Sequence, residues 1–530
     1  MIRIRDISLP PSHTPQQLVQ SAARQLRIRE TEIKQLDIRR KSIDARKKHD
    51  VRIIYTVDVL VKGREDKLLK MAHCPKAGLA QDYIYEVPTP RAAPETRPVV
   101  VGFGPAGMFA ALVLAMAGLR PIVLERGQDA ATRHEKVRKF WQSGVLDPEC
   151  NVQFGEGGAG TFSDGKLNTG VKNPRIGWVL EQFAAAGAPE SILYDAKPHI
   201  GTDVLLSVVQ NLRQAVIHYG GEVRFGAKLV GIETKDGHVS AAVYEQGGKT
   251  HTLACRQLIL AIGHSARDTF EFLHEMGVPM EPKPFSMGVR IEHPQRCIDE
   301  SQYGAFAGHP ALGAADYKLN VKLPDGNSAY TFCMCPGGSV VAAASEAGGV
   351  VTNGMSDFAR DGENANAALL VTLHPEDFPG KSVLGGMYWQ REIEQTAYRM
   401  GGENYRAPAQ LVGDFLAHKP STEAGSVKPT YRPGVRFCDL HDVLPRKITD
   451  VLERALPELD KRLRGYADPD AVMTAPETRS SSPVRIVRGE NRQSSLAGLY
   501  PCGEGAGYAG GIMSAAVDGM QTAEAVLAAQ

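Results

Sequence analysis

Val99-Val-Val-Gly102-Phe-Gly104-Pro-Ala-Gly107 is the stretch of sequence that decides the fold. The three valines predict a buried strand, the glycines predict a tight turn, and the proline suits the first position of a helix. A second strand, Pro121-Ile-Val-Leu-Glu125, follows one helix length later, and its acidic residue lies 18 positions beyond Gly107. Strand, glycine turn, helix, strand and acid in this order are typical of a dinucleotide-binding βαβ unit.

The residues of this unit have separate expected roles. Gly102 permits the turn, Gly104 lets backbone N–H groups approach a pyrophosphate, and Gly107 lets the helix pack against the strand. The helix N-terminus favours the anion, and Glu125 is expected to accept hydrogen bonds from ribose hydroxyls. We therefore predict cofactor contacts from Gly102, Gly104, Pro105, Ala106, Gly107, Glu125 and Arg126.

The same stretch raises the question of a membrane span. Residues 99–119 contain no charged side chain over 21 positions, which is long enough to cross a bilayer. The glycine turn in its interior favours a strand and a helix instead, so we predict no membrane span. The eight cysteines are sparse and no secretory leader is recognisable, which predicts a cytoplasmic protein with reduced thiols.

Two further glycine-rich loops, 155–166 and 503–511, decide which dinucleotide is expected. NAD needs neither loop, whereas the ribityl chain and ring of FAD extend across the fold, and Glu504 can hold a ribityl hydroxyl. A helix that begins near Gly511 would direct backbone N–H groups and its positive dipole end to the N1 and O2 edge of the flavin. We predict FAD as the cofactor, with further contacts from Gly160, Thr161, Ser163, Lys166, Gly263, Gly503, Glu504, Gly511, Ile512 and Met513.

Several motifs carry a resemblance to a known family. The first glycine loop, Leu124-Glu125-Arg126, Ala261-Ile-Gly263 and Gly503-Glu504 are together similar to the FAD-binding domain of the glutathione-reductase superfamily. Segments 160–167, 261–268, 477–485 and 508–514 resemble the uncharacterised bacterial FAD-dependent dehydrogenases, and the resemblance extends over nearly the whole chain. It implies the fold and the flavin, and it indicates no substrate.

Four polar residues are candidates for facing the flavin: Lys166, His264, Arg479 and Arg485. A cation near N1 or near a substrate carboxylate would assist hydride transfer, and His264 could move a proton. A histidine or arginine that follows a strand is also often a turn-capping group, so both interpretations stay open. No metal site is predicted.

The segment Cys333-Met-Cys335 invites a redox interpretation. A disulfide across one intervening residue is strained, and zinc would need two more ligands at suitable spacing. The alternation of Tyr330, Phe332 and Met334 with the cysteines is typical of a half-buried strand. We therefore expect that the two thiols are not a catalytic couple.

Charge and proline content predict the domain organisation. Residues 1–70 carry 17 Lys and Arg against 9 Asp and Glu, although the formal net charge of the whole chain is +1. Four prolines within 88–98 predict a stiff linker after a basic α+β module at 1–90. The remainder is expected to be a Rossmann-like α/β FAD-binding domain at 97–282 and 471–530, interrupted by a mixed α+β substrate domain at 283–470.

These features predict an FAD-dependent oxidoreductase of the dehydrogenase type, which transfers a hydride at flavin N5 and acts on an unidentified small molecule or electron acceptor. NAD(P)H is expected only as a transient reductant, because the sequence has one dinucleotide fingerprint. Two alternatives stay open: an FAD-dependent RNA-modifying protein that grips RNA through residues 1–90, and a non-enzymatic flavin redox sensor or scaffold. A solvated charged face explains the basic run at 39–48 without nucleic acid.

Overall fold

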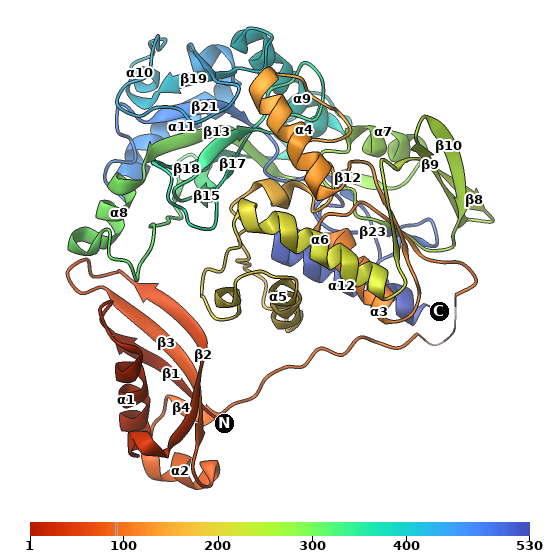
Figure 1. Ribbon diagram of the computed structural model, residues 1–530. Helices are drawn as coiled ribbons and strands as arrows, with labels where there is room; N and C mark the ends of the chain where they lie inside the picture. Colours follow the sequence, from red (N-terminus) through yellow and green to blue (C-terminus); the bar gives the residue numbers. More distant parts are fainter. Residues whose placement is uncertain (91, 93, 530) are drawn as a thin grey trace.

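The computed structural model describes residues 1–90, 92 and 94–529. Its three larger sheets have four, five and seven strands. Figure 1 shows the four-stranded sheet as a separate lobe beneath the body of the molecule, which contains the other two sheets. Within the described residues, no helix is long and apolar enough to cross a membrane.

The five-stranded sheet contains the strands predicted from the fingerprint. All its neighbouring strands are parallel, in the order β23-β11-β5-β6-β7. This order places the two fingerprint strands beside each other near the centre, and the predicted α/β Rossmann-like class is confirmed. The strands are β5 (Val99–Val101), β6 (Ile122–Glu125), β7 (Glu222–Phe225), β11 (Leu258–Leu260) and β23 (Leu499–Pro501).

One helical layer on this sheet is unusually tightly packed. Helix α3 (Pro105–Met116) is apolar on every side and is buried because α12 (Ile512–Ala528) packs along it. A Cβ at Gly519 of α12 would lie 2.1 Å from the Ala106 carbonyl oxygen, so only glycine permits this approach. The layer is completed by α5 (Arg175–Ala185) and α6 (Thr202–His218).

A small antiparallel sheet extends the nucleotide-binding half. Turns at Asp236-Gly237 and Gly247-Gly248, two dipeptides typical of hairpins, connect its three strands. The strands are β8 (Lys228–Lys235), β9 (His238–Gln246) and β10 (Lys249–Ala254), and α7 (Arg267–Glu275) follows β11.

The seven-stranded sheet forms the second half of the body, in the order β14-β15-β18-β13-β21-β19-β20. Its two long central strands pair over ten residues and are buried on both faces. Strand β21 belongs to this sheet, although the predicted insertion ends at residue 470. The strands are β13 (Phe285–Pro294), β14 (Asn320–Lys322), β15 (Ser328–Cys335), β18 (Asn364–Leu373), β19 (Ala407–Leu411), β20 (Val435–Phe437) and β21 (Val472–Glu477), and the helices are α8 (Gln295–Tyr303), α9 (Gly385–Gly401), α10 (Val412–Leu416) and α11 (Arg446–Asp460).

The N-terminal lobe is the basic α+β module that the sequence predicts. Thr14 caps its first helix in a capping box, and Pro15 occupies the first turn. The fully buried Asp58 carboxylate accepts hydrogen bonds from Arg3 at 2.8 Å and from Arg39 at 2.7 Å, so part of the positive charge is neutralised internally. The elements are β1 (Ile2–Leu9), α1 (Pro15–Leu26), β2 (Ile33–Asp44), β3 (Arg52–Val61), α2 (Glu65–Ala72) and β4 (Ala77–Leu79).

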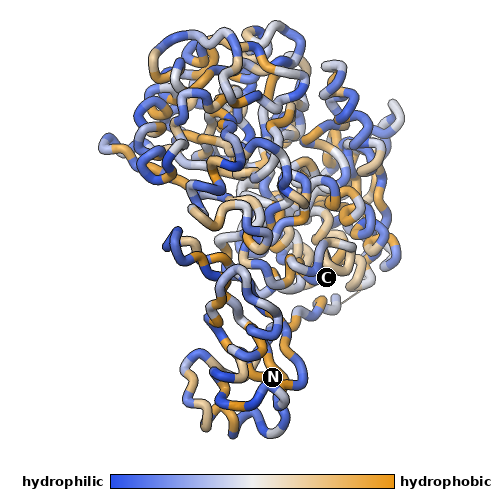
Figure 2. The backbone as a smooth tube through the Cα atoms, turned by 60° about the vertical axis from the view of Figure 1, so that its left-hand side comes forward, coloured by the Kyte–Doolittle hydropathy of each residue, from blue (hydrophilic) through white to orange (hydrophobic). Residues whose placement is uncertain are grey.

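This module is attached to the body through one strand edge and one loop. The Lys41 N–H donates to the Tyr194 carbonyl at 2.7 Å, and the Ala196 N–H donates to the Lys41 carbonyl at 2.8 Å. Val51, at the end of the β2–β3 hairpin, packs into the apolar core of the seven-stranded sheet. Figure 2 shows the same narrow junction from another side. The basic run at 39–48 therefore contributes a backbone contact within the chain.

The connection from the module to β5 contains no helix or strand among its described residues after β4. Tyr85 fixes it to the body, since its ring packs against Trp178 and its hydroxyl donates to Glu524 at 2.9 Å. Residues 91 and 93 of the predicted proline linker lie outside the described residues. The remaining elements are α4 (Ala130–Ser143), the strand pair β12 (Met280–Pro282) and β22 (Val484–Ile486), the strand pair β16 (Ser339–Ala342) and β17 (Thr352–Met355), and short 3-10 turns.

Replacing Gly107 by Ala tests the packing of the first helix against the glycine turn. A Cβ at Gly107 would lie 1.9 Å from the Gly102 carbonyl oxygen, so the helix must move away from β5. We expect a loss of about 3 kcal/mol in stability, the range typical of overpacking, and less bound flavin. Thermal unfolding and the flavin-to-protein absorbance ratio measure both. Gly177→Ala, where no atom lies within 4 Å of the new Cβ, is the control; equal effects of the two substitutions would contradict the packing argument.

Candidate functional site

A cavity of about 320 Å³ lies at the carboxyl ends of the central parallel strands. Its wall contains the end of β5, the end of β6 and the segment after β11, and on the opposite side it contains residues of the seven-stranded sheet. Ligands of open α/β sheets bind at this edge, and the volume lies within the range of small-molecule and cofactor pockets.

Glycine lines the narrow part of the cavity for steric reasons. Gly102 has φ of +94°, and a Cβ there would lie 2.3 Å from the Ala261 carbonyl oxygen. The Cα of Gly158 lies 3.6 Å from the position that a Cβ on Gly104 would take, so the first and second glycine loops face each other. Backbone from both loops is therefore accessible to a ligand at the N-terminus of α3, where helix amides favour a phosphate.

Glu125 connects these two loops. Its Oε2 accepts the Phe103 N–H at 2.7 Å, and its Oε1 accepts the Gly127 N–H at 2.8 Å and the Gly155 N–H at 2.9 Å. The side chain also lines the cavity. A carboxylate has about four acceptor positions, so three backbone amides leave one position on Oε2 for a ligand hydroxyl. The predicted ribose contact therefore remains possible chemically, but the carboxylate also holds the fold of the site.

Arg133 of α4 shapes the second glycine loop from inside the protein. Its guanidinium is fully buried and donates to the carbonyls of Asn151, Val152 and Glu156 at 2.7 to 2.8 Å, and also to those of Gly155 and Gly158. Burial lowers the pKa of Arg133 to about 10. One side chain thus satisfies carbonyls that a tight loop cannot pair internally.

The third glycine loop is fixed by α12. Asp518 accepts the Gly503 N–H at 2.8 Å, and it is paired with Arg488 and Arg492. The N-cap of α12, Gly511, and the first residue of the helix, Ile512, line the cavity. Glu504 also lines it, and burial raises the pKa of its carboxyl to about 7. The beginning of the helix and a carboxyl with this pKa therefore face the same space.

Most residues predicted to contact the cofactor border this cavity. Those in its wall are Gly102, Gly104, Pro105, Ala106, Glu125, Arg126, Gly160, Ser163, Lys166, Gly263, Glu504, Gly511 and Ile512. The structure does not bring four others to the wall: Gly107, Thr161, Gly503 and Met513. Gly107 packs on Gly102 and Thr161 bonds to the Glu156 carbonyl, so these two support the loops from behind.

Of the four polar candidates, Arg485 does not reach the cavity. It lies on β22, is about 39% exposed, and pairs with Glu281 at 3.0 Å. Its strand pairs with β12, and its guanidinium lies 5.4 Å from the centre of the Tyr508 ring, outside the cavity wall. Lys166, His264 and Arg479 do line the cavity.

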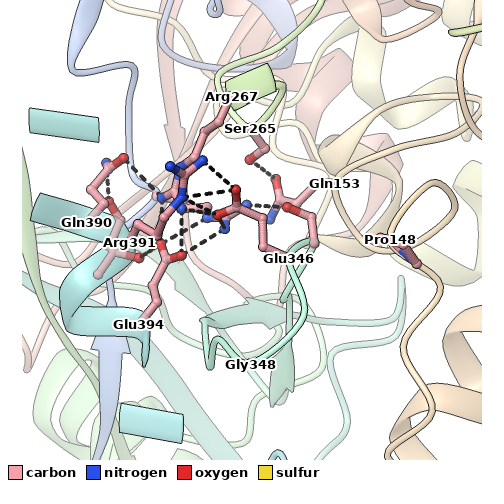
Figure 3. A network of polar contacts seen from close by, with 12 residues as sticks. Pro148, Gln153, Ser265, Arg267, Glu346, Gly348, Gln390, Arg391 and Glu394 are labelled. Atoms are coloured by element: carbon pink, nitrogen blue, oxygen red, sulfur yellow. Dashed lines mark hydrogen bonds and ion pairs between the residues drawn. The ribbon is translucent and has the colours of Figure 1, made fainter. Parts of the chain in front are cut away.

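Arg479 belongs to a buried charge network that could not be predicted from the sequence. Figure 3 labels four other members of this network, Arg267, Glu346, Arg391 and Glu394. The Nε and Nη2 of Arg479 donate to the two oxygens of Glu394 at 3.0 and 2.8 Å, and Arg267 bonds to the same carboxylate. Glu346 pairs with Arg267 and with Arg391. The interpretation of Arg479 as a free anion receptor is therefore corrected, because Glu394 already occupies its fork.

This network determines the protonation of His264. Burial and the charges of Arg479 and Arg267 lower the pKa of His264 to about 3. Its Nδ1 lies 3.1 Å from the Ser265 hydroxyl. At neutral pH the imidazole is uncharged, so it is a weak base and a poor proton donor in this environment.

Lys166 faces the cavity from the second glycine loop. Its ammonium lies 2.9 Å from Asp164, which is also paired with Arg360, and it donates to the Met334 carbonyl. Asp164 raises the pKa of Lys166 against the effect of burial. The amine is therefore a fixed positive charge at neutral pH.

Cys333 does not follow the alternating strand pattern that the sequence predicts. The register of β15 against β18 shifts between Phe332 and Cys335, and Cys333 has φ of +43°. This bulge turns Cys333 into the cavity wall, whereas Cys335 is fully buried. The expectation of an ordinary half-buried strand is therefore wrong at this point.

The cavity fits a bound FAD on observations of the protein itself. Three loops without side-chain bulk meet at one helix N-terminus, a carboxylate acceptor lies at the end of β6, and a second helix begins at the far end of the wall. Arg126, whose guanidinium carbon lies 4.0 Å from the centre of the Phe154 ring, lines the cavity next to Glu125. The first two loops and Glu125 would hold the adenosine and pyrophosphate, and Gly511 and Ile512 would face the flavin.

Comparisons with known proteins agree with this fit. A family model described as FAD-dependent protein, C-terminal domain-like, matches residues 284–480, and a domain of unknown function matches residues 1–60. A Clostridium beijerinckii protein described as uncharacterized is 49% identical over 99% of this chain and 98% of its own length. The chain belongs to the same family of FAD-dependent proteins. The matched range 284–480 includes β21, as does the seven-stranded sheet.

Solved structures are related only distantly. A flavin-dependent brominase variant has a TM-score of 0.38 and 13% identity, covering 82% of this chain and 80% of its own. A geranylgeranyl bacteriochlorophyll reductase-like protein from Thermoplasma acidophilum has a TM-score of 0.37 and 12% identity, covering 81% of this chain and 77% of its own.

Replacing Glu125 by Ala tests its double role. Three buried amides lose their charged acceptor, and each hydrogen bond to a charged group contributes about 1.5 to 3 kcal/mol. We expect a clear drop in the unfolding midpoint together with weaker FAD retention, measured by thermal unfolding and by equilibrium dialysis of FAD. The control is Glu149→Ala, which removes a part-exposed carboxylate paired with Arg126 and Lys228. Loss of FAD with unchanged stability would show that Glu125 serves the ligand alone.

Proposed function

We propose that this protein is an FAD-dependent oxidoreductase that transfers a hydride at flavin N5 and acts on a small molecule or electron acceptor. The observation that supports it is the composition of one cavity wall. Glycine loops of the parallel sheet face Cys333, Glu477 and Arg479 of the seven-stranded half across the same space. A nucleotide site and a polar, second-domain surface thus share a single cavity.

The FAD that this cavity fits would supply hydride and electron transfer when bound. The protein itself would hold and orient the cofactor and exclude water from the cavity. Glu125 fixes the two loops on either side of the narrow part, and Arg133 keeps the second loop in shape. The apolar lining, from Phe154, Ile262 and Ile512 among others, limits water next to the ring.

In this proposal Glu504 is the residue that donates or accepts a proton. Its carboxyl is protonated in about half of the molecules near pH 7, so it can donate or accept a proton in the physiological range. His264, whose Nε2 lies 3.9 Å from Glu504, stays neutral at that pH. Lys166 keeps its positive charge and would favour a negatively charged ring or substrate nearby.

We also propose that NAD(P)H, if it is the reductant, binds only transiently in the same cavity. The described residues form one parallel nucleotide-binding sheet, and its loops border the cavity that FAD would occupy. The nicotinamide would therefore have to enter from the substrate side, where Cys333 and Arg479 lie.

Anaerobic stopped-flow reduction of the FAD-loaded protein by NADH and NADPH tests this proposal. We expect purified protein to be yellow, reduction to be slow or weakly saturating, and small inhibitors of the cavity to compete with the nicotinamide. Colourless protein that binds no added FAD would refute the assignment. Fast reduction with tight nicotinamide binding that is insensitive to such inhibitors would show a separate nucleotide site.

A pH-difference infrared experiment tests the assignment of the proton to Glu504. The carboxyl C=O band should disappear with a midpoint near pH 7 in the wild type and should be missing in Glu504→Gln. The pKa of Glu504 in the folded protein lies above the value of about 4.3 in an unfolded chain. The contribution of this carboxyl to the free energy of unfolding is therefore complete below a pH of about 4.3 and is lost as the pH rises through 7. Glu281→Gln, at a half-exposed ion pair, should keep the band; a wild-type midpoint near 4.5 would contradict the assignment.

A further inference from the structure

We propose that Cys333 is a nucleophilic thiol of this cavity, which forms a covalent bond with a soft electrophilic carbon such as the β-carbon of an α,β-unsaturated carbonyl compound. Neither the flavin nor a disulfide is needed for this step. The proposal therefore goes beyond the oxidoreductase function and can fail independently of it.

The first support is the position of the thiol. The bulge in β15 places Cys333 in the cavity wall with a backbone conformation that non-glycine residues rarely adopt. Two cations hold this conformation, because Arg290 donates to the Cys333 carbonyl at 3.0 Å and Lys166 donates to the Met334 carbonyl. The strand is thus fixed at the point where Cys333 borders the cavity.

The second support is the charge around the sulfur. Cys335, two positions along the same bulge, is fully buried, and its thiol donates to the Cys333 carbonyl at 3.3 Å. The proximity of this protonated thiol favours the thiolate of Cys333. Lys166 and Arg290 act in the same direction, whereas Asp164 opposes them. The net effect lowers the pKa of Cys333 to about 5 and raises that of Cys335.

The carboxyl groups on the other sides do not reverse this balance. Glu477 is neutralised by Arg290, to which its two oxygens lie at 3.1 Å. The pKa of Glu504 is raised to about 7 by burial and, in part, by the charge of Cys333. The arrangement therefore favours a negative charge on the Cys333 sulfur and a proton on the Glu504 carboxyl.

Cys333 and Cys335 have different roles in this proposal, which explains why they form no disulfide. All eight cysteines of the chain are free thiols. Cys333 serves as the attacking group, and Cys335 stays protonated beside it and donates to its carbonyl, which requires that both stay reduced. In the proposed step the sulfur electron pair forms the S–C bond, the π pair of the C=C bond moves to the α-carbon, and water supplies the proton there.

Alkylation with iodoacetamide tests the proposal with a step of the same kind, in which the S–C bond forms and iodide leaves. The rate at each cysteine is measured by mass spectrometry between pH 6 and 8, on FAD-loaded protein and on protein stripped of FAD. Cys297 is the internal reference, because it is exposed on α8 and its pKa is raised.

We expect the Cys333 rate to change less than twofold between pH 6 and 8, because the thiolate is already formed. The Cys297 rate should rise about tenfold per pH unit, in proportion to its thiolate fraction. At pH 6 Cys333 should react about tenfold faster than Cys297 after allowance for the lower nucleophilicity of a low-pKa thiolate.

Cys335→Ala should restore a pH-dependent rate at Cys333, because the neighbouring thiol that favours the thiolate is lost. Cys255→Ser, at a buried cysteine outside the cavity wall, should not. A Cys333 rate that parallels Cys297 over the pH range, or no labelling with and without FAD, would overturn the proposal. FAD content, read from the flavin absorbance of the same samples, reports separately on the oxidoreductase proposal.

Discussion

The carboxylate of Glu125 is the interaction on which the rest of the site depends. It joins the turn after β5, the end of β6 and the second glycine loop through three backbone amides. Those loops carry almost no side chains that could pack against each other, so a buried acceptor has to replace packing. An acid at the end of the second strand is therefore required by the protein before any ribose is considered. The ligand takes the acceptor position that the backbone leaves free.

Two kinds of buried arginine also hold segments of the site together by polar contacts in place of side-chain packing. Arg133 satisfies carbonyls of a loop, with carboxylates only at a distance, and its cost of burial is offset by five hydrogen bonds. Arg267 and Arg479 instead share the Glu394 carboxylate between α7, α9 and the segment after β21, and so connect the two halves of the body at the cavity rim. Removing one partner of such a buried cluster leaves an uncompensated charge, which makes the junction of the two halves specific.

The sequence predicts the parts of this structure that are local and fails where distant residues meet. The βαβ unit depends on residues close together in the chain, and it is confirmed. The hairpins near Asp236 and Gly247 and the capped helix after Thr14 are local in the same sense. Arg133 and Glu394 could not be predicted, because each is an ordinary polar residue within a helix until its partners, 18 to 127 residues away, are known. The alternation around Cys333 failed because a one-residue bulge changes the face of every later side chain.

The pKa values of three groups in the cavity wall are shifted in different directions, each for its own reason. Burial is the main cause of the raised pKa of Glu504, and the charge of Cys333 adds to it. Two neighbouring guanidinium groups add to burial at His264, and a neighbouring thiol with two cations outweighs burial at Cys333. Near neutral pH the cavity therefore contains a neutral imidazole, a half-protonated carboxyl and a thiolate. Such separation of protonation states within one cavity is typical of catalytic sites. It arises because charged residues of the second half, Arg290 and Arg479, lie near these groups together with Lys166 of the second glycine loop.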